Sequence, residues 1–137
     1  MAADFKLKDG DFVRTTLASI ASATVVEAGD VVELDTGLIV KGTATGAALA
    51  WTPGGSAAGE TEIEVTVGND FTLLGTGDAA FAVTQKGTEV DLVVDTGVQL
   101  IDVGASSTDV FKIGISTDSG TVGSTADIEV KINKPLF

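Results

Sequence analysis

The chain has 137 residues, 20 acidic against 8 basic side chains, and a formal net charge of −12. It contains no histidine, cysteine or tyrosine. Disulfides, Ser-His-Asp and Cys-His triads, and the usual ligands of zinc, haem and iron–sulfur clusters are therefore excluded. Nucleic acid and anionic membrane surfaces are polyanions, and we expect a chain of this charge to bind neither.

Short β-strands are predicted along the whole chain. Apolar and polar residues alternate most regularly over residues 60–67 and 127–132, which places the apolar ones on one face. Gly, Thr, Asp and Ser are concentrated between the strands and favour turns, and residues 52–59 and 116–125 are expected to be exposed loops. In chain order, the predicted strands cover residues 12–16, 31–34, 38–40, 47–51, 60–67, 71–74, 79–85, 90–94, 98–103, 110–115 and 127–132.

The spacing of these strands, roughly 8–12 residues, predicts an all-β fold, either a compact antiparallel β-barrel or a β-sandwich. Residues 15–28 are rich in alanine, but their apolar positions do not follow a helical period, so we expect at most one short helix. We predict an N-terminal arm over residues 1–14, followed by a single β domain over residues 15–137. The first ten residues contain no apolar core of a secretory signal, and we expect synthesis in the cytoplasm.

A weak internal repeat relates residues 29–67 to residues 87–132. Each part begins with a glycine, continues through an acidic and aliphatic run to Asp-Thr-Gly, and ends in an alternating strand. A duplicated β unit would explain this order, with the two units sharing one core. Chance similarity is the alternative in a chain so rich in Gly, Thr and Val.

Candidate chemistry is sparse. Glu62 with Glu64, and Asp127 with Glu129, could bring two carboxyl groups together, as in glycosidases. The same spacing is typical of the solvent-exposed face of an amphipathic strand, which is the interpretation we favour. No segment has the ligand spacing of a calcium loop, and the glycine-rich segments lack the lysine of a phosphate-binding loop. We expect no enzyme activity, no metal and no cofactor.

Charge is distributed unevenly along the chain. Residues 42–111 contain ten acidic residues and a single basic one, Lys86, whereas residues 1–14 contain three of each sign. The chain ends also carry apolar side chains, which are normally frayed into water unless something covers them. They either cap the domain's own core or dock on another subunit or partner. These side chains are Phe5, Leu7 and Phe12 near one end and Leu136 and Phe137 at the other.

Five segments, taken in order, carry a resemblance to a known family. They are Gly29-Asp-Val-Val32, Glu62-Ile-Glu-Val-Thr-Val-Gly68, Gly77-Asp78, Ile113-Gly-Ile-Ser116 and Ile128-Glu-Val-Lys-Ile132. From about Asp4 to the end, this layout resembles the capsid cement, or head decoration, proteins of tailed bacteriophages. The chain departs from the family pattern at Ser116, where alanine is typical, and in a longer stretch over residues 98–109.

The resemblance implies a non-catalytic structural protein that binds the major capsid protein on the outer capsid surface of the virion and stabilises the shell. It also implies a homo-oligomer, commonly a trimer. On this hypothesis we expect capsid contacts at Phe5, Leu7 and Phe12, and subunit contacts at Trp51, Leu136 and Phe137. Two alternatives stay open: an extracellular adhesin or surface-layer-type β-sandwich module, and another virion component such as a tail or fibre domain.

Overall fold

The computed structural model describes residues 4–10, 14–21, 24–46, 48–57 and 59–136. Within these ranges the chain forms β-strands, one short 3₁₀-helix, η1 (Val83–Gln85), and no α-helix. The strands are β1 (Phe5–Gly10), β2 (Arg14–Ser19), β3 (Val31–Asp35), β4 (Leu38–Lys41), β5 (Ala50–Trp51), β6 (Glu62–Val67), β7 (Phe71–Gly75), β8 (Glu89–Asp95), β9 (Val98–Asp102), β10 (Phe111–Ile113) and β11 (Ile128–Ile132).

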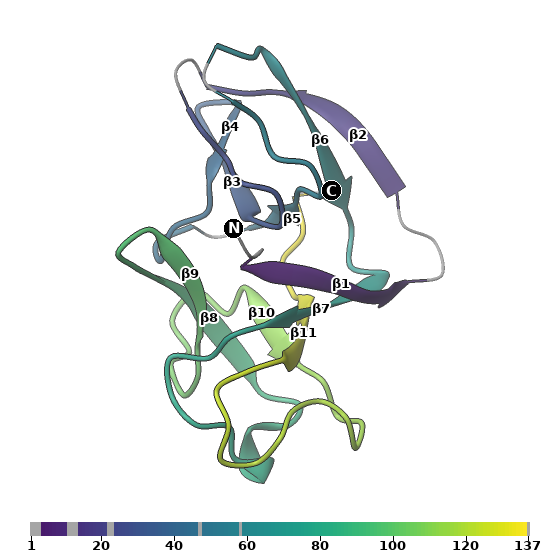
Figure 1. Ribbon diagram of the computed structural model, residues 1–137, viewed down its shortest axis with the longest axis vertical. Coiled ribbons are helices and arrows are strands. Elements are labelled where there is room, and N and C mark those ends of the chain that lie inside the picture. Colours follow the sequence, from purple (N-terminus) through teal and green to yellow (C-terminus); the bar gives the residue numbers. More distant parts are fainter. Residues whose placement is uncertain (1–3, 11–13, 22–23, 47, 58, 137) are drawn as a thin grey trace.

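The strands form two antiparallel sheets, stacked along the long axis of the molecule (Figure 1). The five-stranded sheet has the order β2-β6-β5-β3-β4, and the six-stranded sheet has the order β1-β7-β11-β10-β8-β9. Over the residues that the structure describes, neither sheet closes into a barrel. The predicted all-β fold is therefore confirmed, and of the two predicted architectures the structure has the sandwich-like one.

The two sheets repeat one arrangement of strands. The order β2-β6-β5-β3-β4 matches β7-β11-β10-β8-β9 strand for strand, and β1 is added outside β7. The hairpins β3–β4 and β8–β9 both turn at Asp-Thr-Gly, with φ angles of 52° and 87° at Thr36 and Gly37 and of 52° and 80° at Thr96 and Gly97. A parallel bridge also occurs at the same place in each sheet. It joins Ile20, directly after β2, to Ile39 of β4, and Gly77, just beyond β7, to Ile101 of β9. The shared order extends the sequence repeat backwards to β2 and β7.

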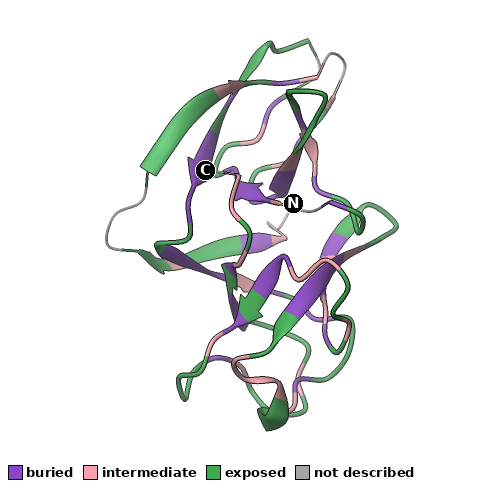
Figure 2. Ribbon diagram, turned by 180° about the vertical axis from the view of Figure 1, so that it is seen from behind, coloured by how far each residue is buried: buried purple, intermediate pink, exposed green. Residues whose placement is uncertain are grey.

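The apolar side chains form two clusters. The smaller one lies against the five-stranded sheet and contains Ile39, Ile63 and Val65. The larger one fills the six-stranded half, but it also contains Val31, Leu49 and Trp51 from the other sheet. The two halves therefore share part of one core, and Figure 2 shows buried segments running through both.

The segment expected to form an N-terminal arm belongs to the six-stranded sheet. Strand β1 pairs antiparallel with β7, and Phe5 is fully buried with its ring centroid 5.3 Å from that of Phe111. The Phe5 ring packs against Gly75. Any larger residue there would place its Cβ atom 2.5 Å from the ring, so the glycine leaves the space that the ring needs. Phe5 therefore covers the domain's own core.

Residues 79–85, predicted as a strand, form a loop that ends in η1. Phe81 is buried and its backbone bonds to Ser124 and Gly123, while the Gln85 side chain accepts from the Ala82 N–H at 2.7 Å. These contacts hold the segment out of the ladder despite its apolar alternation. The two predicted exposed loops also contain buried residues, among them Thr52 and Ser119.

Candidate functional site

The predicted contact residues have different surroundings. Phe5 and Trp51 are buried, and the Trp51 Nε1–H donates to the Gly29 carbonyl at 3.0 Å, so neither ring is available to a partner in this fold. These two assignments were wrong because both rings fill the shared core. Leu136 is half-buried against the smaller cluster, and Leu7 is 43% exposed on β1. The remaining two, Phe12 and Phe137, lie outside the described residues.

The outer face of the six-stranded sheet gathers four of the eight basic residues, Lys6, Lys8, Lys112 and Lys131. They alternate with core residues along β1, β10 and β11, which places them on the outer face, where Lys6, Lys112 and Lys131 are exposed and Lys8 is half-buried. Four acidic residues accompany them: Glu89 is opposite Lys112 in the ladder, Asp127 lies 3.6 Å from Lys6, and Glu129 and Asp118 contact Lys8. We call this surface the charge-balanced face, because the remainder of the described surface is acidic.

Lys8 connects the edge of this face to its centre. Its ammonium donates to Glu129 and, at 2.9 Å, to Asp118. The hydrogen bonds to Glu129 and then Asp118 raise the pKa of Lys8. The hydroxyl of Ser116 and then Lys8 lower the pKa of Asp118 to about 2. These charges therefore persist over the whole physiological pH range.

A shallow depression of about 360 Å³ lies in the charge-balanced face. Lys112 and Lys131 stand directly opposite each other across β10 and β11 at its rim, and Ile115, which is 80% exposed, lies beside them. Two like charges in directly opposed positions destabilise a sheet slightly. Ile115 adds exposed apolar surface to this rim.

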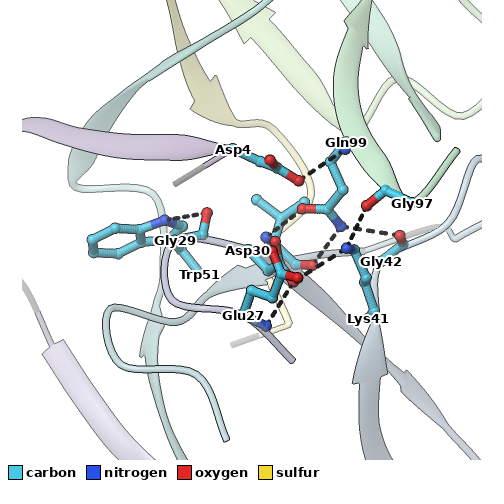
Figure 3. Close-up of polar contacts among 10 residues, drawn as sticks. Asp4, Glu27, Gly29, Asp30, Lys41, Gly42, Trp51, Gly97 and Gln99 are labelled. Carbon is cyan, nitrogen blue, oxygen red and sulfur yellow. Dashed lines mark hydrogen bonds and ion pairs between the residues drawn. The ribbon is translucent and has the colours of Figure 1, made fainter. Parts of the chain in front are cut away.

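The two sheets are joined by a buried polar junction, drawn in Figure 3. The amide of Gln99 on β9 is fully buried and pairs with the backbone of the other sheet. Its Oε1 accepts from the Val31 N–H at 2.9 Å, and its Nε2 donates to the carbonyls of Val31 and Gly42 at 2.8 and 3.0 Å. The Gln99 N–H donates to Asp4 at 2.9 Å. One side chain thus takes the place of a strand pairing between the sheets.

Asp30 and Lys41 form the charged part of this junction. The Asp30 side chain is completely buried, accepts from the Glu27 N–H at 2.9 Å and lies 3.5 Å from the Lys41 Nζ, which also donates to the Gly97 carbonyl at 2.7 Å. Its other oxygen, Oδ1, has no hydrogen-bond partner among the residues that the structure describes. Burial raises the pKa of Asp30, against the opposing effects of the Glu27 N–H and Lys41.

Two further groups of carboxylates organise loops. Asp91 accepts from the N–H groups of Ser107, Thr108 and Asp109 at 2.8–2.9 Å, and these bonds lower its pKa although burial opposes this. Burial and then the neighbouring Asp78 raise the pKa of Asp102. Among the residues that the structure describes, no three acidic side chains meet in a way that could hold a metal ion.

The sequence interpretation missed Gln99 and Asp30. Each carried a signal, a polar residue directly beside a run of aliphatic ones, but their partners lie on other strands. Within the described ranges, no helix is long and apolar enough to cross a membrane. Searches against protein-family models, curated proteins and solved structures found no match to this chain.

Proposed function

We propose that this chain is a non-catalytic structural protein that decorates a tailed-phage capsid from outside and stabilises the shell. The observation that carries the proposal is the charge-balanced face: a protein with a net charge of −12 has one surface where charges cancel and where Ile115 is exposed. On that face an approaching capsid surface meets apolar contact and no net repulsion. The acidic remainder faces solvent and keeps separate copies apart.

The mechanism is one of linkage. A protein that binds only the assembled shell stabilises it by its own binding free energy. Many copies on one lattice multiply a modest individual affinity. The two-sheet scaffold suits this task because the Gln99 junction and the shared core hold the charge-balanced face in a fixed orientation. We include in the proposal that the copies assemble as homotrimers on the shell.

The test is co-sedimentation of the purified protein with empty capsids of the phage that encodes it. The wild-type protein should sediment with the capsids, and Ile115→Glu should weaken binding about tenfold, equivalent to about 1.4 kcal/mol. The matched control is Val25→Glu, which adds the same charge at an exposed aliphatic residue of the five-stranded half. Equal binding of the two variants, or no sedimentation of the wild type, would contradict the proposal.

A further inference from the structure

A sheet edge is a site where another chain can add a strand, and proteins usually protect such edges. Strand β1 is protected by Lys6, Lys8 and a bulge between Leu7 and Asp9. Strand β9 is occupied through Gln99, and the short β4 is bridged to Ile20. Strand β2 is bridged to β4 only beyond its C-terminal end, at Ile20. Apart from Arg14 at its first position it carries no charge and no proline, its six residues follow β6 in unbroken register, and no described strand pairs with its outer edge.

The free hydrogen-bonding groups of β2 can be identified from its neighbours. The Ile20 N–H points towards β6, because it donates to the Thr61 carbonyl at 3.2 Å. The Ala21 N–H points the other way, to the Ile39 carbonyl at 3.1 Å. Since these directions alternate along an antiparallel strand, the N–H and C=O groups of Thr15 and Leu17 point to the open edge, as does the N–H of Ser19. The Ser19 carbonyl lies beside the parallel bridge from Ile20 to Ile39 and belongs to that bridge. Figure 2 shows β2 as an almost entirely exposed strand.

The six-stranded sheet shows what an occupied edge looks like. Leu17 of β2 corresponds to Leu74 of β7, since each lies opposite a glutamate, Glu64 and Glu129 respectively, in the matching ladder. The edge of β7 is covered by β1, where Lys6 lies directly opposite Leu74. Leu74 is accordingly half-buried, whereas Leu17 is 65% exposed.

The acidic residues beside the two edges differ in the same way, since those near β7 have lysine partners and, among the described residues, those near β2 do not. The lysines of β1 reach past β7 to acidic residues of the next strand and directly before it: Lys8 contacts Glu129 of β11, and Lys6 contacts Asp127, which precedes β11. In the five-stranded sheet the corresponding acidic residues are Glu62 and Glu64 on β6. Both are exposed, and neither forms an ion pair with any residue that the structure describes.

We propose that the open edge of β2 is a docking site for an extended segment of another protein in which apolar residues alternate with lysines. The segment adds a sixth strand, antiparallel to β2, and its main chain bonds to Thr15, Leu17 and Ser19. The aliphatic stem of one lysine covers Leu17, and the ammonium groups reach Glu62 and Glu64. The partner is a different protein, because in each copy of this chain the strand with the required pattern, β1, is already paired with β7.

The probe is a capped peptide with the sequence of residues 4–10, Asp-Phe-Lys-Leu-Lys-Asp-Gly, titrated into the isotope-labelled full chain and followed by NMR. We expect amide shifts in β2 and β6, and slower hydrogen exchange at Thr15, Leu17 and Ser19. Leu17→Pro removes one outward N–H without touching the bonds to β6, and should weaken binding about tenfold. Leu17→Ala, which keeps that N–H, should bind within about threefold of wild type.

The charge requirement is tested separately. Glu62→Gln with Glu64→Gln should weaken peptide binding several-fold and flatten its salt dependence, whereas Asp70→Asn, at an exposed turn, should change neither. Shifts confined to β7 and β11 would mean that the peptide displaces β1, and would overturn the proposal, as would no shift at millimolar peptide. The hydrogen-exchange measurement on the wild-type protein tests whether the peptide binds at β2, and it does so even if a variant fails to fold. This site is distinct from the charge-balanced face, so its test is independent of capsid binding.

Discussion

At the scale of single residues, the least favourable group is the buried carboxylate of Asp30. It loses its hydration, and within the described part of the chain the Glu27 N–H and the partly exposed Lys41 ammonium are the groups that compensate. Removing one partner of such a pair leaves a buried charge unpaired, which is far more destabilising than the pair itself is stabilising.

Lys41→Met should therefore lower the free energy of unfolding by about 2 kcal/mol at pH 7. Because burial already raises the pKa of Asp30 above its ordinary value of 3.8 and the variant raises it further, lowering the pH protonates Asp30 in the folded state. The loss should shrink as pH falls from 7 towards 4. Denaturant unfolding of both proteins across this range measures it. A loss that stays constant with pH would contradict the role assigned to Asp30.

Asp91 is the opposite case, a carboxylate held in its charged form. Its three backbone donors lower its folded-state pKa, so its stabilising contribution is present above the ordinary value of 3.8 and is lost as pH falls through the lowered folded value. Asp91→Asn should lower the unfolding free energy by about 2 kcal/mol at pH 7. The difference from wild type should decrease below about pH 4. Thermal melts at neutral and acidic pH test this, with Asp95→Asn at the exposed end of β8 as the control.

At the scale of elements, the two Asp-Thr-Gly hairpin turns both hold a threonine in an unfavourable backbone conformation. Both central residues of such a two-residue turn have positive φ, which glycine adopts readily and a β-branched threonine does not. Thr36 and Thr96 nevertheless have φ angles of 52°. The matching geometry implies that the two hairpins respond alike to the same substitution.

Thr36→Asn and Thr96→Asn should each stabilise the protein by about 0.5 kcal/mol, because asparagine tolerates the left-handed conformation. The double variant should show the sum of the two effects. Chemical denaturation of the three variants against wild type provides the measurement. Destabilisation by either substitution would show that the threonine hydroxyl contributes more than its backbone strain removes.

At the scale of the whole molecule, the question is whether the two sheets unfold together. Val31, Leu49 and Trp51 place part of the five-stranded sheet inside the larger apolar cluster, and Gln99 bonds the sheets directly. Both features predict one cooperative transition.

Gln99→Leu leaves the Val31 N–H and the Gly42 carbonyl without their partner and should lower stability by about 2–3 kcal/mol, or Tm by roughly 6–9 °C. The shared apolar core should still keep calorimetric unfolding a single transition. Asp4→Asn, which retains an oxygen acceptor for the Gln99 N–H, should melt close to wild type. Two separate transitions in Gln99→Leu would show that this amide, rather than the core, couples the sheets.

Much of the architecture could be predicted from local patterns. The alternation in β6 and β11 and the Asp-Thr-Gly turns of both hairpins placed these elements close to their observed bounds. Strand β1 was missed as a strand because its partner β7 lies far along the chain and its lysines resemble a solvated tail. Residues 79–85 were misassigned because the contacts of Phe81 with residues 123 and 124 decide their conformation.

The candidate contact residues show a similar limit. A large apolar side chain near a chain end is visible in the sequence, but whether it fills the core, as Phe5 does, or remains exposed, as Leu7 does, depends on tertiary packing. The charge-balanced face could not be foreseen either, since its lysines come from residues 6 and 8 and from residues 112 and 131. Only the register of β1, β10 and β11 brings them together.

The two ends of the chain cross between the halves. Strand β1 precedes the five-stranded sheet yet pairs with β7, while Pro135 follows the six-stranded sheet yet bridges Leu49 beside β5. During synthesis, β1 leaves the ribosome long before its partner β7 has been made. The smaller apolar cluster of the five-stranded sheet is covered by Leu136 only after that residue has been made. The nascent chain can therefore complete neither half until the residues up to Leu136 have been translated.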